Sequence, residues 1–255
     1  LASLTTVFLQ ILSNLSNDYG DSVHGADSID RQGPVRAVQS GLITLPEMKK
    51  AMYLFGALSL ISGLSLLYLA VQDLQIFLLF LGLGLAAIWA SITYTSGKNP
   101  YGYAGLGDLS VFIFFGLLGV LGTYFLHTYS SNNLAVLIAV ALGFFSTAVL
   151  NINNIRDIDS DKLAGKKSIP VRIGRSNAVK YNWSLIILGN LALLWFVIYS
   201  SEWFSLIALL ASILMIKVAR GVQVAQSAQE TDPYLKKMAI STLFWVVLFG
   251  IGLLF

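Results

Sequence analysis

The sequence predicts an all-α membrane protein: a polytopic transmembrane helical bundle with an Asp-rich site at the cytoplasmic mouth of an apolar cavity. Three observations predict this class: an apolar composition, a series of long apolar stretches, and basic residues confined to alternate connections. Hydrophobic residues make up 56% of the 255 residues and charged residues 11%. In soluble domains about a quarter of the residues are charged.

Eight apolar stretches follow one another, with lengths near the roughly 20 residues that cross a hydrocarbon core. A soluble domain of this size could not bury them all, so we expect eight transmembrane helices in a single domain, residues 1–255. Because the chain starts inside an apolar stretch and without Met, we also expect an N-terminal truncation that removes a ninth, preceding helix. The stretches are Leu1–Ser16, Ala51–Val71, Leu74–Thr95, Ser110–Leu126, Leu134–Ile155, Tyr181–Tyr199, Trp203–Val218 and Met238–Phe255.

Basic residues fall only on the first, third, fifth and seventh connections and the helix ends beside them. By the positive-inside rule these segments are cytoplasmic, which predicts an integral protein of the cytoplasmic (inner) membrane. The net charge of +3 therefore reflects topology, and no stretch mixes basic and aromatic residues as a nucleic-acid groove would. The basic residues are Arg31, Arg36, Lys49, Lys50; Lys98; Arg156, Lys162, Lys166, Lys167, Arg172, Arg175, Lys180; and Lys217, Arg220, Lys236, Lys237.

The cytoplasmic segments also carry helix-start signals. Thr44, Pro46 and Glu47 predict a capped helix start before the membrane, Ser176 predicts a second start, and Asp232-Pro233 a third. Cysteine is absent, which excludes thiolate metal sites, thiol nucleophiles and disulfides.

Two acidic clusters lie on the predicted cytoplasmic side, each directly after an apolar stretch: NDYGD at 17–21, with Asp27 beyond, and NNIRDIDSD at 153–161. Ionisable groups near bilayer depth are costly and usually face a cavity, a partner or a ligand. Carboxylates gathered in this way need cations to hold them. The pattern therefore predicts a divalent metal with an anionic ligand on its other side.

Helical spacing would place the oxygen donors of each cluster on one face. Asn14, Asn17, Asp18 and Asp21 stand at i, i+3, i+4 and i+7. In the second cluster Asn153 or Asn154, Asp157 and Asp161 follow at similar steps, while Asp159 would point elsewhere and is the weaker ligand candidate. Mg²⁺ takes few protein carboxylates and shares its shell with substrate phosphates. The basic side chains able to cover the remaining phosphate charge are Arg36, Lys98, Lys166, Lys167 and Arg172.

A plainer interpretation exists for each residue taken alone. A single Asp at a helix end is most often a cap or a solvated interface residue. Two Asn/Asp stripes on the same membrane side, each after an apolar helix, favour a binding site. Tyr94, Tyr101 and Tyr103 either line the cavity or mark the membrane interface, where tyrosine is common.

The two clusters resemble the two aspartate-rich motifs of the UbiA superfamily of intramembrane prenyltransferases. The resemblance covers essentially the whole chain, and it implies a bundle of nine helices, of which eight are found here. One departure is that Gly25 stands where the general first motif has its last Asp; the next acid is Asp27. That spacing, with the string YTSGKNPYGYAGLGD, is most similar to the branch that prenylates 1,4-dihydroxy-2-naphthoate in menaquinone synthesis.

The resemblance implies roles for particular residues. Mg²⁺ would be held by Asp18, Asp21, Asp27, Asp157 and Asp161. Catalysis would depend on Asp21, Asp157 and Lys98, the last in the loop where the family has a basic residue directed at the diphosphate. The diphosphate would also contact Asn17, Arg36, Asn153, Asn154, Lys166 and Arg172.

The implied reaction is Mg²⁺-dependent transfer of a polyprenyl group from its diphosphate to 1,4-dihydroxy-2-naphthoate, with loss of CO₂ and diphosphate, giving demethylmenaquinol/demethylmenaquinone. Two alternatives stay open: another aromatic acceptor such as 4-hydroxybenzoate, and a cation-coupled transporter. Against a transporter, the acids lie at cytoplasmic helix ends and not near the midplane. The expected partners are the polyprenyl diphosphate, an aromatic acid and the lipid bilayer. The sequence shows no sign of nucleic acid or of an obligate protein partner.

Overall fold

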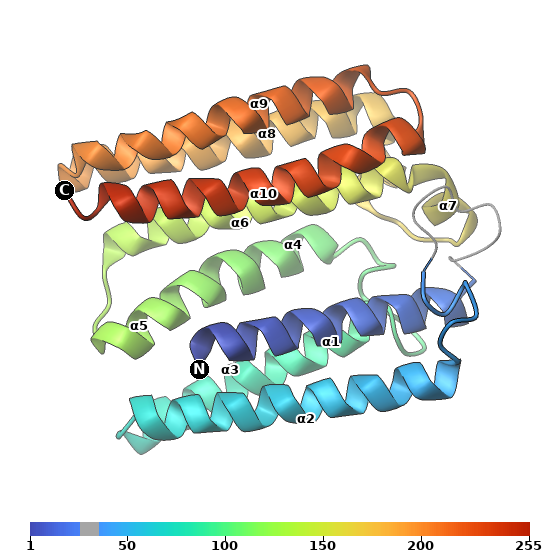
Figure 1. Ribbon diagram of the computed structural model, residues 1–255, viewed down its shortest axis with the longest axis horizontal. Coiled ribbons are helices and arrows are strands. Elements are labelled where there is room, and N and C mark those ends of the chain that lie inside the picture. The colour runs from blue at the N-terminus through green and yellow to red at the C-terminus, as the bar shows by residue number, and fades with distance from the viewer. Residues whose placement is uncertain (26–35) are drawn as a thin grey trace. The chain divides into compact units, whose positions relative to one another are not determined.

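A computed structural model describes residues 1–25 and 36–255. The regular secondary structure of this part of the chain is entirely helical, without strands (Figure 1). The segments in chain order are α1 (Ala2–Val23), α2 (Leu45–Ala70), α3 (Leu74–Thr93), α4 (Gly107–Val111), the π-helical η1 (Phe112–Gly122), α5 (Thr123–Thr128), α6 (Asn133–Arg156), α7 (Ile158–Leu163), α8 (Ile169–Ser200), the 3₁₀ segment η2 (Trp203–Ala208), α9 (Leu209–Val224) and α10 (Ala228–Gly252).

The predicted fold class, an all-α polytopic bundle, is confirmed. Among the described residues, seven helices are long and apolar enough to cross a membrane. Two of them combine several segments: α4, η1 and α5 form Gly107–Thr128, and η2 with α9 forms Trp203–Val224. The first predicted stretch, Leu1–Ser16, forms most of α1, a helix of 22 residues that also carries the polar NDYGD cluster.

The chain divides into two compact units. The first comprises Leu1–Leu106 with Ser160–Lys167, and the second comprises Gly107–Asp159 with Ser168–Phe255. In the first unit α1, α2 and α3 pack against one another. In the second unit α6 packs against η1, α8 and α10, and α9 packs against α8 and α10.

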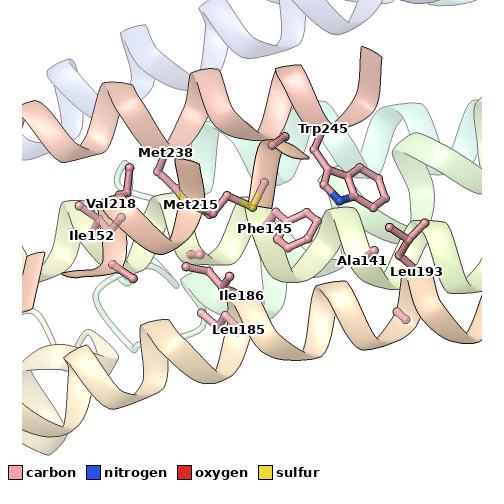
Figure 2. Packing of buried hydrophobic residues seen from close by; sticks show 14 of the residues in the cluster. Ala141, Phe145, Ile152, Leu185, Ile186, Leu193, Met215, Val218, Met238 and Trp245 are labelled. Atoms are coloured by element: carbon pink, nitrogen blue, oxygen red, sulfur yellow. The ribbon is translucent and has the colours of Figure 1, made fainter. Parts of the chain in front are cut away.

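The core of the second unit lies around Phe145 of α6 (Figure 2). Its ring meets the edge of the fully buried Trp245 of α10 at 5.2 Å between centroids. Gly189 of α8 lies so close to Phe145 that a side chain there would clash with the ring, and Gly143 of α6 lies similarly close to Phe112 of η1. Small residues at these contacts allow the helices to approach closely, which is how helices associate in a membrane.

The three predicted helix starts can be compared with the structure. Ser176 does not begin α8, which starts at Ile169; it lies just after a kink at Gly174, which leaves the helical conformation (φ 78°, ψ 160°). At α2 the prediction is confirmed: Thr44 accepts a hydrogen bond from the Glu47 backbone, and the Glu47 carboxylate accepts one from the Thr44 backbone. At α10 the prediction is wrong. The helix begins at Ala228, because Ser227 accepts from the Glu230 amide and caps it, so Asp232-Pro233 lies inside its second turn.

The second acidic cluster does not form the predicted continuous helical face. α6 ends at Arg156, and Asp157 leaves the helical conformation (φ −95°, ψ 13°) before α7 begins at Ile158. Asn, Asp and Ser compete for backbone hydrogen bonds and favour helix ends, so a run of them weakens the helix there. Asn153 and Asp157 therefore precede the break, and Asp161 follows it.

Candidate active site

The first acidic cluster lies at the end of α1, which is pinned to the segment after α3. The hydroxyls of Thr95 and Ser96 donate to the Ser16 carbonyl at 2.8 and 3.3 Å. Gly20 faces the backbone of Thr95 so closely that a Cβ would clash with it. Gly20 thus allows α1 to approach that segment, and Asp21 next to it is buried, with 2% of its surface exposed.

Asp21 is the centre of a charged cluster in the first unit. Its Oδ1 lies 2.8 Å from Nζ of Lys166 and accepts a hydrogen bond from the Tyr103 hydroxyl at 3.0 Å. Its Oδ2 lies 2.8 Å from Nη1 of Arg36. Burial by itself would raise the pKa of Asp21, but the cations of Lys166 and Arg36, with the hydrogen bonds from Lys166 and Tyr103, outweigh it and lower that pKa. The carboxylate therefore stays ionised.

Lys166 connects the two acidic motifs. Besides Asp21 it reaches Oδ1 of the buried Asp161 at 3.3 Å, and its ammonium lies 5.0 Å from the centre of the Tyr103 ring. The backbone holds the loop in the same place, because the Lys167 amide donates to the Tyr103 carbonyl at 2.9 Å. Two aspartates from motifs far apart in the sequence thus share one ammonium group.

Asn17 and Asp18 add unused oxygen acceptors on α1. Asp18 Oδ2 accepts from the Ala37 amide at 3.2 Å, and Arg36 donates to the Asn17 carbonyl at 2.8 Å. The side-chain oxygen of Asn17 (Oδ1) and the second carboxylate oxygen of Asp18 (Oδ1) are buried without a hydrogen-bond partner in the structure. Buried acceptors without a donor are costly, and amide and carboxylate oxygens are the ligands that hard cations prefer. These residues therefore fit a divalent cation.

Among residues 1–25 and 36–255, no three His, Asp or Glu side chains gather closely enough to hold a metal ion by themselves. A cation at this site would thus share its coordination shell with amide oxygens, phosphate oxygens or water. Asp27, the remaining acid predicted from the first motif, lies outside the described residues.

In the second unit, Asp157 is held by its neighbour Arg156. Nε and Nη2 of the buried guanidinium reach Oδ1 and Oδ2 of Asp157, both at 2.7 Å. Nη2 also donates to Oδ1 of Asn153 at 2.8 Å, and Nη1 lies 2.7 Å from Oδ1 of Asp232 on α10. Arg156 and Asp232 were not among the predicted site residues. Sequence spacing carries no signal that joins positions 156 and 232.

The other predicted site residues differ in burial. Asn154 is buried on α6, whereas Asp159 is exposed. Lys98 is exposed after α3, and no ion pair joins it to another described residue. Arg172 is exposed near the start of α8. The structure thus brings together Asp21, Asp161, Arg36 and Lys166 in the first unit, and Asn153 with Asp157 in the second.

One further buried carboxylate, that of Asp108, was not predicted from the sequence. Asp108, at the start of α4, is 8% exposed, and its Oδ2 accepts a hydrogen bond from the Tyr181 hydroxyl of α8 at 3.0 Å. The Thr147 hydroxyl of α6 also points to the Asp108 carbonyl at 3.5 Å. Asp108 closes the string YTSGKNPYGYAGLGD, but its burial depends on contacts with distant helices.

The model of the UbiA prenyltransferase family matches residues 1–248 of the chain. This chain belongs to the UbiA prenyltransferase family. It is therefore a prenyltransferase and an integral membrane protein, as its apolar helices indicate. The recognition of the family from its two acidic motifs is confirmed, and family membership sets the transporter alternative aside.

Several curated proteins are similar to nearly the whole chain. A 1,4-dihydroxy-2-naphthoate octaprenyltransferase of Haemophilus influenzae is 43% identical over 255 residues, which cover 100% of this chain and 83% of the relative. Proteins of the same name are 44% identical in Escherichia coli, covering 99% and 82%, and 35% identical in Mycobacterium tuberculosis, covering 97% and 82%. No solved structure matches the chain significantly.

Proposed function

We propose that this UbiA-family enzyme transfers a polyprenyl group from polyprenyl diphosphate to 1,4-dihydroxy-2-naphthoate. Release of diphosphate and CO₂ would give demethylmenaquinol, the reduced form of demethylmenaquinone. The acceptor is proposed from the names of three relatives that are 35–44% identical over nearly the full chain. The observation that carries the donor site is the charged cluster in which Lys166 joins Asp21 and Asp161, with Arg36 on the other oxygen of Asp21.

The cluster suits a diphosphate because it provides both signs of charge in a buried place. Lys166 and Arg36 carry the donors that a diphosphate requires, and each is now paired with a carboxylate. The oxygens of Asn17, Asp18, Asp21 and Asp161 would hold Mg²⁺. The resemblance of the two acidic motifs to those of the family assigns the same role to Asp157 and Asp27. Bound there, Mg²⁺ supplies Lewis-acid stabilisation of the negative charge on the departing diphosphate.

The chain's own residues would then act on the two ends of the substrate. Arg36 and Lys166 stabilise the negative charge that grows on the bridging oxygen as the allylic C–O bond breaks. The polyprenyl tail is accommodated among the apolar helices, which also exclude water from the allylic cation. The electron-rich naphthoate ring attacks that cation, and the ring carboxylate leaves as CO₂. Because the basic segments are cytoplasmic by the positive-inside rule, the site would face the cytoplasm from the inner membrane.

The test is an assay in proteoliposomes that contain a polyprenyl diphosphate, 1,4-dihydroxy-2-naphthoate and Mg²⁺, with products and CO₂ followed by mass spectrometry. A prenylated, decarboxylated naphthoquinol that disappears with EDTA and returns with Mg²⁺ is the expected result. Turnover with 4-hydroxybenzoate alone would discard the naphthoate acceptor. Metal-independent turnover would reject Mg²⁺.

A further inference from the structure

Arg156 lies between two carboxylates that come from different parts of the sequence. Its side chain is 5% exposed and spans Asp157 on one side, through two parallel hydrogen bonds of 2.7 Å, and Asp232 on the other, at 2.7 Å. Asp232 belongs to α10 and to neither acidic motif. Asp232 is nevertheless as close to the Arg156 guanidinium as Asp157 is, at 2.7 Å in both contacts.

The charge count explains why a second carboxylate matters. A bidentate pair of Arg156 with Asp157 alone would be neutral, and a neutral pair attracts a divalent cation weakly. With Asp232 present the three side chains carry one positive and two negative charges. Because the guanidinium is shared, Asp157 keeps part of its negative charge for a further partner.

The position of Asp232 is well supported, although its side chain is 36% exposed. The preceding Thr231 is fully buried, and its hydroxyl donates to the Ser227 carbonyl at 2.7 Å. Arg175 of α8 donates to the Ala225 carbonyl at 2.6 Å and to the Thr231 hydroxyl at 3.3 Å. The connection between α9 and α10 is thus fastened to α8, which holds Asp232 opposite Arg156.

We propose that Asp232 is a positioning residue for the metal–diphosphate site: it shares Arg156 with Asp157 and so leaves Asp157 oriented and negatively charged toward a divalent cation. This inference rests on the proposed function, in which Asp157 contributes to Mg²⁺ binding. Asp232 itself does not contact the substrate in this proposal; it acts through Arg156.

The experiment measures binding of an unreactive polyprenyl thiolodiphosphate to the protein in detergent while the Mg²⁺ concentration is varied. Asp232→Asn keeps the side-chain shape and an oxygen acceptor but removes the charge. We expect it to raise the Mg²⁺ concentration for half-maximal binding by about 10-fold or more, the usual cost of losing an outer-shell partner. Binding at saturating Mg²⁺ should be retained, and Asp232→Glu should restore the wild-type Mg²⁺ requirement.

Asp159→Asn is the matched control, because it removes the same charge from an exposed position in the acidic motif that contains Asp157. An unchanged Mg²⁺ requirement in Asp232→Asn, with a lower melting temperature, would mean that Asp232 is merely structural and would overturn the proposal. An equal shift in Asp159→Asn would attribute the effect to overall charge and would also overturn it.

The same assay separates this inference from the proposed function. If the wild type binds the analogue with Mg²⁺ but does not prenylate naphthoate, only the acceptor assignment fails, and the comparison of variants still decides the role of Asp232. If the wild type binds the analogue without any Mg²⁺ dependence, the metal site and the role of Asp232 are both rejected.

Discussion

The ammonium nitrogen of Lys166 lies 2.8 Å from Oδ1 of Asp21, so the loop after the second acidic motif is joined directly to the first motif. A buried ion pair offsets the cost of removing its charges from water only where further hydrogen bonds or charges satisfy both groups, as Arg36, Tyr103 and Asp161 do here. The Lys166 and Asp21 side chains are mostly buried, at 15% and 3% exposed. The contact therefore organises the donor site within the first unit.

Replacing Lys166 by Met should weaken binding of the polyprenyl diphosphate. A hydrogen bond to a charged group contributes about 1.5–3 kcal/mol, which corresponds to roughly 10- to 100-fold in KM for the donor. Steady-state kinetics with varied donor concentration measure this change. Lys162→Met is the matched control, because Lys162 is an exposed lysine of α7. Equal effects of the two substitutions would contradict the assigned role of Lys166.

Asp21→Asn should reduce turnover on the order of 100-fold or more, since it removes a carboxylate from the metal–diphosphate site and leaves Lys166 and Arg36 less well neutralised. Asp159→Asn should have a mild effect because that side chain is exposed. Turnover numbers compared at saturating substrates, with the melting temperature of each variant as a folding check, test this prediction. Full activity of Asp21→Asn would reject the metal assignment.

The Asp108–Tyr181 contact should be important for stability. Tyr181→Phe leaves a buried carboxylate oxygen without the hydroxyl that donates to it at 3.0 Å. An unsatisfied buried acceptor lowers the free energy of unfolding by about 1–3 kcal/mol, and by more when the acceptor is charged. Equilibrium unfolding in mixed detergent micelles would measure the loss. Asp108→Asn should cost less, because the amide removes the buried charge. The reverse order would show that the hydroxyl contact is unimportant.

Gly20→Ala should destabilise the packing of α1 against the segment after α3. A methyl group at position 20 meets the Thr95 backbone, and overpacking of this kind costs about 1–3 kcal/mol. Thermal unfolding of the detergent-solubilised protein is the measurement. Gly56→Ala on α2 is the control, since nothing lies within 4 Å of a methyl group there. Similar melting temperatures for the two variants would show that the close approach at Gly20 is unnecessary.

Local sequence features predicted much of the fold. Most of each apolar stretch lies in helical segments, because the length and hydropathy of a stretch are local properties and a chain in a bilayer must satisfy its backbone hydrogen bonds within the helix. The Thr44–Glu47 cap was predictable for the same reason, since its atoms are within three residues of each other. The family, too, was predicted from the sequence, through two acidic motifs of recognisable spacing.

The candidate site was only partly predictable. The sequence identified the carboxylates themselves. It also predicted one continuous helical face, which is wrong at Asp157, because α6 ends there and the Asp157 side chain pairs with Arg156. Lys98 was expected to act in catalysis, with Arg36 and Lys166 among the residues at the diphosphate. In the structure Lys166 and Arg36 contact Asp21, whereas Lys98 is exposed.

The sequence by itself determined the all-α membrane class and which motifs hold the acids. Only the tertiary structure decided which polar groups pair: Asp21 with Lys166, Arg156 with Asp232, and Asp108 with Tyr181. The physical reason is the separation in sequence over which each interaction acts. Hydropathy and capping act over one or a few turns, whereas a buried ion pair depends on packing between helices that are distant in the sequence.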